Sequence, residues 1–331
     1  MPRKTYRRVI VTAELLSQVN PDNKKLVERF LKEKSNSSSQ VTVKNYMSDA
    51  NIFFVYNLLY NNNKIFTDIK KLEFIDFFSF CLNELRWSSS RANRMRSFLS
   101  SLSQYIERVL DEEYPAFRNL VLKAVQSIPK EIRREKTILT DEQIQELLNY
   151  LSEKDSQQAL WLALATYSGS RFSEILRFTT ELINPDNSVF EGLFLETTKE
   201  IKTKGRGRSG KMIYKYILRD KFLPYYYKWI EEREKILKEK NKEHNMLFIK
   251  SDGSPATEGT IRSWISTMER HLNVPFYAHS LRHFLCTELT RKKIPQQFIQ
   301  FLFGWSSAEM YNIYNDLTAK DMSWSGLENL K

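Results

Sequence analysis

The sequence predicts a mainly α-helical protein of two domains, with a small β-sheet or hairpin in the second domain. The 331 residues are too many for a typical single core. Apolar residues recur three and four positions apart in both halves, as in amphipathic helices. Only 9 glycines and 9 prolines occur, which argues against collagen-like, low-complexity and turn-dense all-β chains. The 41% of hydrophobic residues suffices for packed cores, so wholesale disorder is not expected.

The charge balance favours a polyanionic partner, nucleic acid before a membrane surface. Lys and Arg number 51 against 40 Asp and Glu, a formal net charge of +11. Cys81 and Cys286 lie far apart and outside any Cys-x-x-Cys, which excludes a disulfide framework and a thiolate zinc site. No apolar signal region follows the basic first residues, and the longest charge-free apolar run, 159–167, is about half a membrane span. We therefore expect a cytoplasmic protein without a membrane partner, with 159–167 as a buried helix.

Four amphipathic helices are predicted in the first domain, residues 21–130, after a basic arm at residues 1–20. The first helix begins near Asn23. The second follows a serine N-cap within 35–40 and ends at the three asparagines 61–63. The third and fourth carry aromatic and aliphatic residues at core spacing, which predicts a compact helical bundle. Their core-facing residues are Phe74, Phe77, Phe78 and Cys81 in the third helix, and Phe98, Leu102, Tyr105 and Ile106 in the fourth.

The fourth helix opens at the serines 88–90 and carries three arginines in its first two turns. These are Arg91, Arg94 and Arg96. A linker at 131–137 is polar, basic and without periodicity, and a capping-box-like start at Thr140 opens the second domain, 138–331. That domain is predicted to be helical except at 189–219, where β-favouring runs flank three glycines and predict a hairpin with a long tip.

The hairpin segment carries the densest positive charge of the chain. Between 199 and 219 eight basic residues face the single acid Glu200: Lys199, Lys202, Lys204, Arg206, Arg208, Lys211, Lys215 and Arg219. A charge run is by default a solvated surface. Here the interleaved glycines and the net charge favour contact with phosphates.

Four separate stretches carry side chains that suit phosphodiester chemistry. They contain Arg171 with Glu174, His279 with Arg282, Trp305 after a glycine, and Tyr311 with Tyr314. Taken singly, each has an ordinary structural explanation, such as an i,i+3 ion pair between Arg171 and Glu174. Together they form a coherent set, because guanidinium groups bind phosphate oxygens, an imidazole and a lysine move protons, and a phenol can attack phosphorus.

In order and spacing these residues resemble the tyrosine recombinase (phage integrase) family. Its signature is an Arg after a Gly turn, a Lys on a β-hairpin, His-x-x-Arg, a His or Trp after Gly, and then the nucleophilic Tyr. Arg282 and Trp305 are 23 residues apart and Trp305 and Tyr314 are 9 apart, as in Cre-like and Xer-like members, whereas Tyr311 follows Trp305 after 6. The run SGSRFSEIL around Arg171 is also similar to integrases of archaeal viruses.

The resemblance implies a helical core-binding domain followed by a mostly α catalytic domain. It implies site-specific recombination or integration through a 3′-phosphotyrosyl intermediate and a Holliday junction, at the nucleoid of the host cell. The implied partners are double-stranded DNA with an inverted-repeat core site, a homotetramer on that DNA, and optional accessory DNA-bending factors. No cofactor is implied, since the phosphotyrosine conserves the bond energy and no P-loop or dinucleotide motif occurs.

The resemblance also assigns roles. Tyr314 is the implied nucleophile, and Arg171 and Arg282 hold the phosphate. His279 handles or orients the proton, and Trp305 packs and contacts phosphate. Glu174 and His283 are expected to support these residues from behind. The expected DNA-phosphate ligands are Arg91, Arg94, Arg96, Lys199, Arg206, Arg208 and Lys211.

The general acid is expected among the hairpin lysines. A lysine directly before a turn glycine is the Xer-like arrangement and favours Lys204, with Lys202 second. Counting from Arg171 as in Cre-like members points nearer Lys199 instead. Two features depart from the family pattern. The hairpin is long, and the stretch 284–295 lacks the usual turn glycine.

Three other interpretations of these residues are less well supported. A type IB topoisomerase would use nearly the same residues, but the two-domain layout and the Trp-to-Tyr spacing argue against it. A non-catalytic DNA-binding descendant is disfavoured because every catalytic position is filled. A zinc site at His279 and His283 lacks a third ligand nearby, so no metal is expected.

The tail, residues 315–331, is too apolar for an inert exposed end. Its apolar residues are Leu317, Met322, Trp324, Leu327 and Leu330. We expect it to dock on a neighbouring protomer and couple the tyrosines of the assembly. Docking on its own domain is nearly as well supported.

Overall fold

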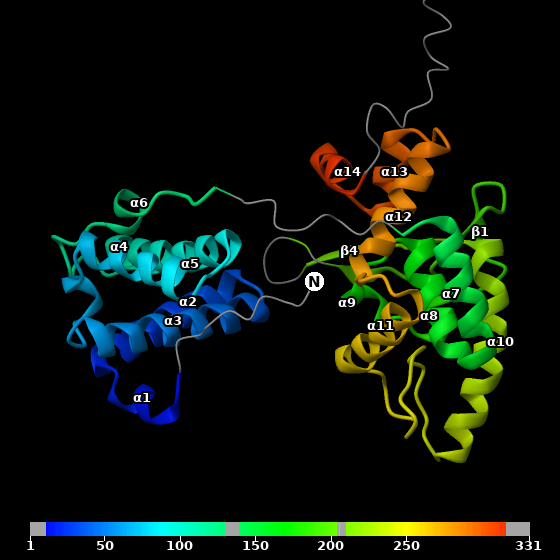
Figure 1. Ribbon diagram of the computed structural model, residues 1–331, viewed down its shortest axis with the longest axis horizontal. Coiled ribbons are helices and arrows are strands. Elements are labelled where there is room, and N and C mark those ends of the chain that lie inside the picture. The colour runs from blue at the N-terminus through cyan, green and yellow to red at the C-terminus, as the bar shows by residue number, and fades with distance from the viewer. Residues whose placement is uncertain (1–10, 130–138, 204, 206–209, 316–331) are drawn as a thin grey trace, which may run out of the picture. The chain divides into compact units, whose positions relative to one another are not determined.

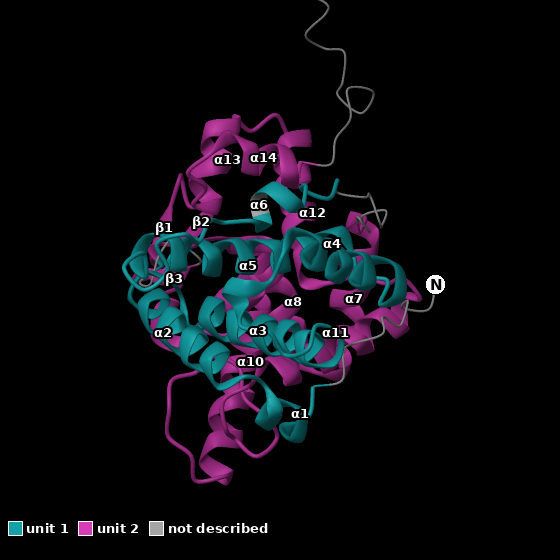
Figure 2. Cartoon of the chain, turned by 90° about the vertical axis from the view of Figure 1, so that its left-hand side faces the viewer, with its two compact units in different colours: residues 1–134, 205–210 teal, residues 135–204, 211–331 magenta. Residues whose placement is uncertain are grey.

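The chain divides into two compact units in the computed structural model (Figures 1 and 2), which describes residues 11–129, 139–203, 205 and 210–315. The first unit comprises residues 1–134 with 205–210, and the second comprises 135–204 with 211–331. Both are mainly helical, so the predicted fold class is confirmed. Expectations for the start of the arm, the linker, Lys204, Arg206, Arg208 and the tail lie outside the described residues. Within the described residues no helix is both long and apolar enough to cross a membrane.

The first unit is a helical bundle built as the sequence predicts. Its elements are α1 (Ala13–Gln18), α2 (Pro21–Ser37), α3 (Gln40–Tyr60), a 3-10 turn η1 (Phe66–Asp68), α4 (Lys71–Ser79), a π-helical turn η2 (Phe80–Glu84), α5 (Ser89–Val109) and α6 (Val121–Ala124). Ser39 and Ser88 cap α3 and α5 by accepting backbone hydrogen bonds from Thr42 and Arg91. Helix α3 ends at Asn61, where two further asparagines take left-handed backbone conformations. The predicted core residues of the third and fourth helices are buried.

The second unit surrounds one helix that is buried over most of its length. Its helices are α7 (Asp141–Lys154), α8 (Ser156–Ser168), α9 (Phe172–Ile175), the 3-10 turn η3 (Thr180–Leu182), α10 (Arg219–Glu239), α11 (Glu258–Leu272), α12 (Ala278–Arg291), α13 (Gln296–Phe303) and α14 (Ala308–Tyr314). Residues 159–168 of α8 are all buried, which confirms the apolar run 159–167 as a core helix, and α7, α10 and α12 pack against it. Thr140 and Gln143 form the predicted capping box of α7.

The predicted hairpin is two small sheets rather than one. A three-stranded antiparallel sheet has the order β1 (Ser188–Val189), β2 (Phe194–Glu196), β5 (Tyr216–Leu218), with Phe194 opposite Leu218. Beyond it, β3 (Ile201–Thr203) and β4 (Lys211–Ile213) form a separate hairpin, with Ile201 opposite Ile213. The ladder is interrupted where the Thr197 hydroxyl accepts the Lys215 backbone N–H at 3.0 Å and donates to the Lys199 carbonyl at 2.9 Å. The side chain of Thr197 therefore separates the two sheets.

Candidate active site

The turn before α9 places the first arginine. Helix α8 ends at Gly169 in the left-handed conformation (φ +55°), where an added Cβ would lie 2.6 Å from Phe303. Arg171 then precedes α9, and its Nη1 and backbone N–H donate to Glu174 Oε1 and Oε2, each at 2.8 Å. The predicted Arg171–Glu174 ion pair is thus confirmed. Its carboxylate is fully buried, whereas 19% of the Arg171 side chain stays exposed.

Arg282, on α12, joins this turn to the last helices of the chain. Its Nη1 donates to the Gly169 carbonyl and its Nη2 to the Phe303 carbonyl at 3.4 Å, and only 1% of the residue is exposed. Its guanidinium carbon lies 4.6 Å from the Phe303 ring centroid and 5.1 Å from those of Trp305 and Tyr314. Burial, with the positive charge of Arg171, lowers the pKa of Arg282 to about 10.

The β3–β4 hairpin packs on the turn that carries Trp305. Helix α13 ends at Gly304 in the left-handed conformation (φ +65°), where Ile213 of β4 fills the space that a Cβ would need. The ammonium of Lys211 lies 3.4 Å from the Gly304 carbonyl. Trp305 is buried, stacked on Tyr314 at 5.2 Å between ring centroids. The part of the hairpin that begins at Lys211 therefore borders the site.

The two tyrosines of α14 have different surroundings. The Tyr311 hydroxyl shares a hydrogen bond with Thr290 Oγ1 at 3.1 Å and accepts one from Asn315 Nδ2 at 3.3 Å, a structural arrangement. Tyr314 is 5% exposed and lies among Trp305, Arg282 and the ring of His283, whose centroid is 4.6 Å away. Helices α12, α13 and α14, orange to red in Figure 1, pack against one another and so bring these groups together.

Two histidines of α12 border Tyr314. His279 is exposed, with its ring centroid 6.3 Å from that of Tyr314. Partial desolvation and then the charges of Arg282 and Arg171 lower the pKa of His279, which favours the neutral ring that can accept a proton. His283 is buried, with its ring centroid 4.6 Å from that of Tyr314.

One site residue was misread in the sequence. Lys215 was counted with the exposed basic residues of the hairpin, but it is fully buried and its Nζ lies 2.6 Å from Glu174 Oε2. A signal was present, because Lys215 is the lone charge in the run MIYKYIL. Burial alone would raise the pKa of Glu174, but Lys215 and Arg171 together lower it to about 2.

The other predicted contact residues divide between the two units. Lys199 and Lys202 are exposed in the second unit, and the Lys202 carbonyl accepts a hydrogen bond from Arg177 at 2.7 Å. In the first unit Arg91 and Arg94 form ion pairs with the buried Asp49, at 2.7 and 3.0 Å. Arg91 also stacks on Trp87, and Arg96 donates to the Val125 carbonyl at 2.6 Å. These intradomain contacts were not foreseen from the sequence.

Comparisons with known proteins agree with the residue pattern. The family described as the phage integrase family matches residues 137–321, more than half of the chain. A tyrosine recombinase of Thermosipho africanus is 25% identical over 280 residues, which cover 83% of this chain and 88% of the relative. The fold is similar to that of the Tn1549 transposon integrase in complex with transposon right end DNA (TM-score 0.68, 14% identity, 93% and 99% coverage). It is also similar to the lambda integrase in a tetramer bound to a Holliday junction (TM-score 0.62, 19% identity, 88% and 77% coverage).

Proposed function

The chain belongs to the phage integrase family and is a tyrosine recombinase, and on that basis we propose that it recombines double-stranded DNA at a specific site with Tyr314 as the nucleophile. The observation that supports this most strongly is the position of Tyr314 beside Arg282. Its ring centroid lies 5.1 Å from the guanidinium carbon, and Arg282 is itself bonded to the turn that carries Arg171. Arg282 thus links the candidate nucleophile to the turn that carries the other guanidinium group.

In the proposed reaction the phenol oxygen of Tyr314 attacks phosphorus and the bond to the 5′-oxygen breaks. The products are a 3′-phosphotyrosyl link and a free 5′-hydroxyl, and the reverse attack by another 5′-hydroxyl rejoins the strand. Arg171 and Arg282 bind the non-bridging oxygens, and His279 takes the phenol proton. The proton for the 5′-oxygen comes from a hairpin lysine, Lys204 first and Lys202 second.

A covalent-capture experiment tests this proposal. Wild-type protein is incubated with a pool of short duplexes that have randomised centres and single nicks at staggered positions. Cleavage beside a nick releases a short fragment, so the protein remains linked to its DNA and the captured sequences define a selected duplex. We expect an inverted repeat around a short spacer, whereas capture without sequence preference would indicate a topoisomerase.

Two matched tyrosine variants decide the nucleophile on the selected duplex. Tyr314→Phe should form no adduct. Tyr311→Phe should still form it, with a loss of about 1 kcal/mol in stability, since its hydroxyl hydrogen bonds on α12 and α14 disappear. An adduct formed by Tyr314→Phe would refute the assignment.

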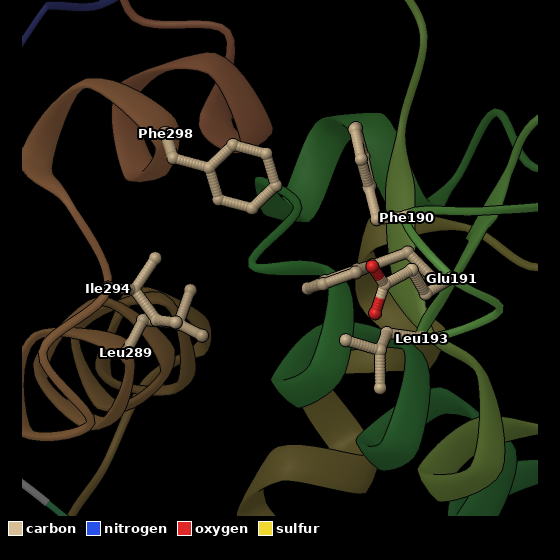
Figure 3. Close-up of a pocket in the computed structure, with 7 residues that line it drawn as sticks. Phe190, Glu191, Leu193, Leu289, Ile294 and Phe298 are labelled. Carbon is tan, nitrogen blue, oxygen red and sulfur yellow. The ribbon is translucent and has the colours of Figure 1, made fainter.

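We further propose that the recombinase assembles as a tetramer on paired sites, with the tail 315–331 of one protomer docked on the next. An apolar groove in the second unit is a suitable acceptor (Figure 3). Phe190, Glu191 and Leu193 line one side, and Leu289, Ile294 and Phe298 line the other. Leu193 is 61% exposed and Phe301, next to the groove, is 50% exposed, apolar surface that the apolar tail could cover.

A further inference from the structure

Lys215 is held rigidly at the junction of the two small sheets. Its backbone N–H donates to Thr197 Oγ1 at 3.0 Å, and its carbonyl accepts the Thr197 N–H at 2.9 Å. The side chain is 1% exposed, and its ammonium lies 2.6 Å from Glu174 Oε2 on α9. The strand before α10 is thereby tied to the residue that positions Arg171.

Glu174 is shared between two cations from different elements. Its Oε1 accepts Arg171 Nη1 at 2.8 Å, while its Oε2 accepts both Lys215 Nζ at 2.6 Å and the Arg171 backbone N–H at 2.8 Å. Arg171 therefore meets the carboxylate with one end of its guanidinium fork. The partly exposed remainder can face a substrate oxygen.

Stability alone does not account for this buried pair. Desolvating an ammonium and a carboxylate costs as much as or more than their attraction returns, and apolar replacements of buried ion pairs are often neutral or stabilising. Tyr216 and Ile217, which follow Lys215 in the chain, belong to the hydrophobic cores, whereas the lysine faces charged groups. A charge at this position is better explained by what it does to Glu174.

We propose that Lys215 is a positioning residue for DNA cleavage, which shares the charge of Glu174 and so leaves the Arg171 guanidinium available to the scissile phosphate. The inference rests on the proposed function, because Arg171 is assigned there to the phosphate. Without Lys215, the buried carboxylate would have Arg171 as its remaining cationic partner among those that it contacts in the described structure. It would then draw the guanidinium towards itself and away from the DNA.

The test is a double-mutant cycle with Lys215→Met, Glu174→Gln and the pair combined, measured as single-turnover cleavage of the selected duplex at saturating protein. Lys215→Met should lower the cleavage rate by up to about 100-fold, the size of effect that small misplacements produce, with the dissociation constant for DNA nearly unchanged. Combining it with Glu174→Gln removes the uncompensated carboxylate. The double variant should therefore cleave much faster than the two single losses would predict if they were independent.

A matched control separates positioning from folding. Arg233 is also buried in the second unit, but it donates to the carbonyls of Met246 and His244 at 2.8 and 2.5 Å. Arg233→Met should lower the melting temperature and leave the cleavage rate of the folded protein unchanged. If Lys215→Met does not fold, the double variant is compared with Glu174→Gln alone, and it should cleave at least as fast.

The outcomes distinguish this inference from the proposed function. Absence of any wild-type adduct, or an adduct in Tyr314→Phe, would refute the proposed function itself. If the wild type forms its adduct at Tyr314 but Lys215→Met cleaves at the wild-type rate, Lys215 has no positioning role. A double variant slower than Glu174→Gln alone, or no faster than the independent losses predict, would equally overturn the inference.

Discussion

Two cations share a single buried carboxylate in the site, and a third cation lies nearby. Arg171 and Lys215 contact Glu174, and Arg282 is hydrogen-bonded to the turn before Arg171, so the cluster carries a positive excess before any substrate arrives. Burial, and after it the charge of Arg282, lowers the pKa of Lys215 although Glu174 acts in the opposite direction. A phosphodiester would supply the missing negative charge. The protein therefore maintains an electrostatic cost in the free state that DNA binding relieves.

This cost predicts how the stability of the second unit changes with pH. The pKa of Lys215 falls from its usual 10.5 to about 8 in the folded protein, through burial first and then the facing guanidinium groups of Arg282 and Arg171, against Glu174. Between about pH 8 and pH 10.5 the unfolded chain binds more protons at Lys215 than the folded protein does. The free energy of unfolding therefore increases as the pH rises through this range. In urea unfolding, the free energy of unfolding of the wild type should increase relative to that of Lys215→Met from about pH 8 upwards. The increase should be a few kcal/mol at most, as the size of the pKa shift implies. A pH-independent difference between the two would contradict it.

Gly169 is predicted to be irreplaceable for two independent reasons. An alanine there would hold a strained left-handed backbone and press its Cβ against Phe303, which should cost about 2–4 kcal/mol and displace the carbonyl that Arg282 binds. Gly169→Ala should therefore lower both the melting temperature and the yield of covalent adduct. Gly259→Ala is the matched control, because its Cβ would meet its nearest atom at 3.7 Å inside α11 and should gain up to about 1 kcal/mol. Equal behaviour of the two variants would show that the turn tolerates a side chain.

The general acid can be identified by changing the leaving group. With sulfur in place of the 5′-bridging oxygen, departure needs no proton, so a variant that lacks only the acid should recover. Lys204→Ala should be defective on ordinary DNA and largely active on the sulfur substrate. Lys202→Ala and Lys211→Ala are tested beside it, the latter because its ammonium lies 3.4 Å from the Gly304 carbonyl. Rescue of one of these in place of Lys204→Ala would reassign the role.

Residue types and spacing identified most of the groups that the fold brings together. Four of these groups belong to short motifs that can be recognised from residue type and order along the chain: Arg171, Arg282, Trp305 and Tyr314. Lys215 does not, because its role depends on a carboxylate 41 positions away. The separation of the hairpin into two sheets was equally invisible, since it depends on where the Thr197 hydroxyl finds its partners.

At the scale of elements, the helix starts and the antiparallel hairpin were predictable, but the division of the hairpin strands between two sheets was not. Ser39, Ser88 and Thr140 cap their helices through contacts three residues along the chain, which local sequence determines. The paired residues of β2 and β5 are 20 to 24 positions apart in the chain, and β3 and β4, which lie between them in sequence, form a second sheet. Antiparallel pairing over such a distance is decided by tertiary packing, here against α8.

Two arginines at the start of α5 are expected to have different roles, one in DNA binding and one in stability. Arg91 is stacked on Trp87 and paired with the fully buried Asp49, and 21% of its side chain is exposed, whereas 44% of Arg94 is exposed. Arg94→Ala should lower the slope of log affinity against log salt by about one unit, as expected for one lost phosphate contact. Arg91→Ala should mainly lower the melting temperature of the first unit, because Asp49 loses a partner. DNA titrations over a range of salt concentrations check both, and an unchanged slope for Arg94→Ala would move the DNA away from this end of α5.

At the scale of the whole molecule, we expect function to need both units, with the proposed catalytic groups in the second. The groups around Tyr314 come from the α8–α9 turn, β4, α12, α13 and α14, all within residues 135–204 and 211–331. The first unit offers Arg94 and its neighbours, and we expect it to set affinity rather than the rate of cleavage. Coordination among protomers would require a contact between them, and we expect the apolar tail and the groove to form it.

The last prediction concerns that contact. Truncation after Thr318 removes four of the five apolar tail residues, and Leu193→Glu places a charge in the groove at a position 61% exposed in the isolated chain. Both changes should leave cleavage of single selected duplexes intact and impair the pairing of two duplexes, measured as branched junctions on a gel. Leu72→Glu, on an exposed leucine of α4, is the control and should pair duplexes normally. If the tail docks in trans, the groove is empty in the protein without DNA. Neither change should then lower the melting temperature of the protein without DNA. A parallel loss of melting temperature in both would place the tail on its own domain instead, and normal junction formation by both would remove the tail from assembly altogether.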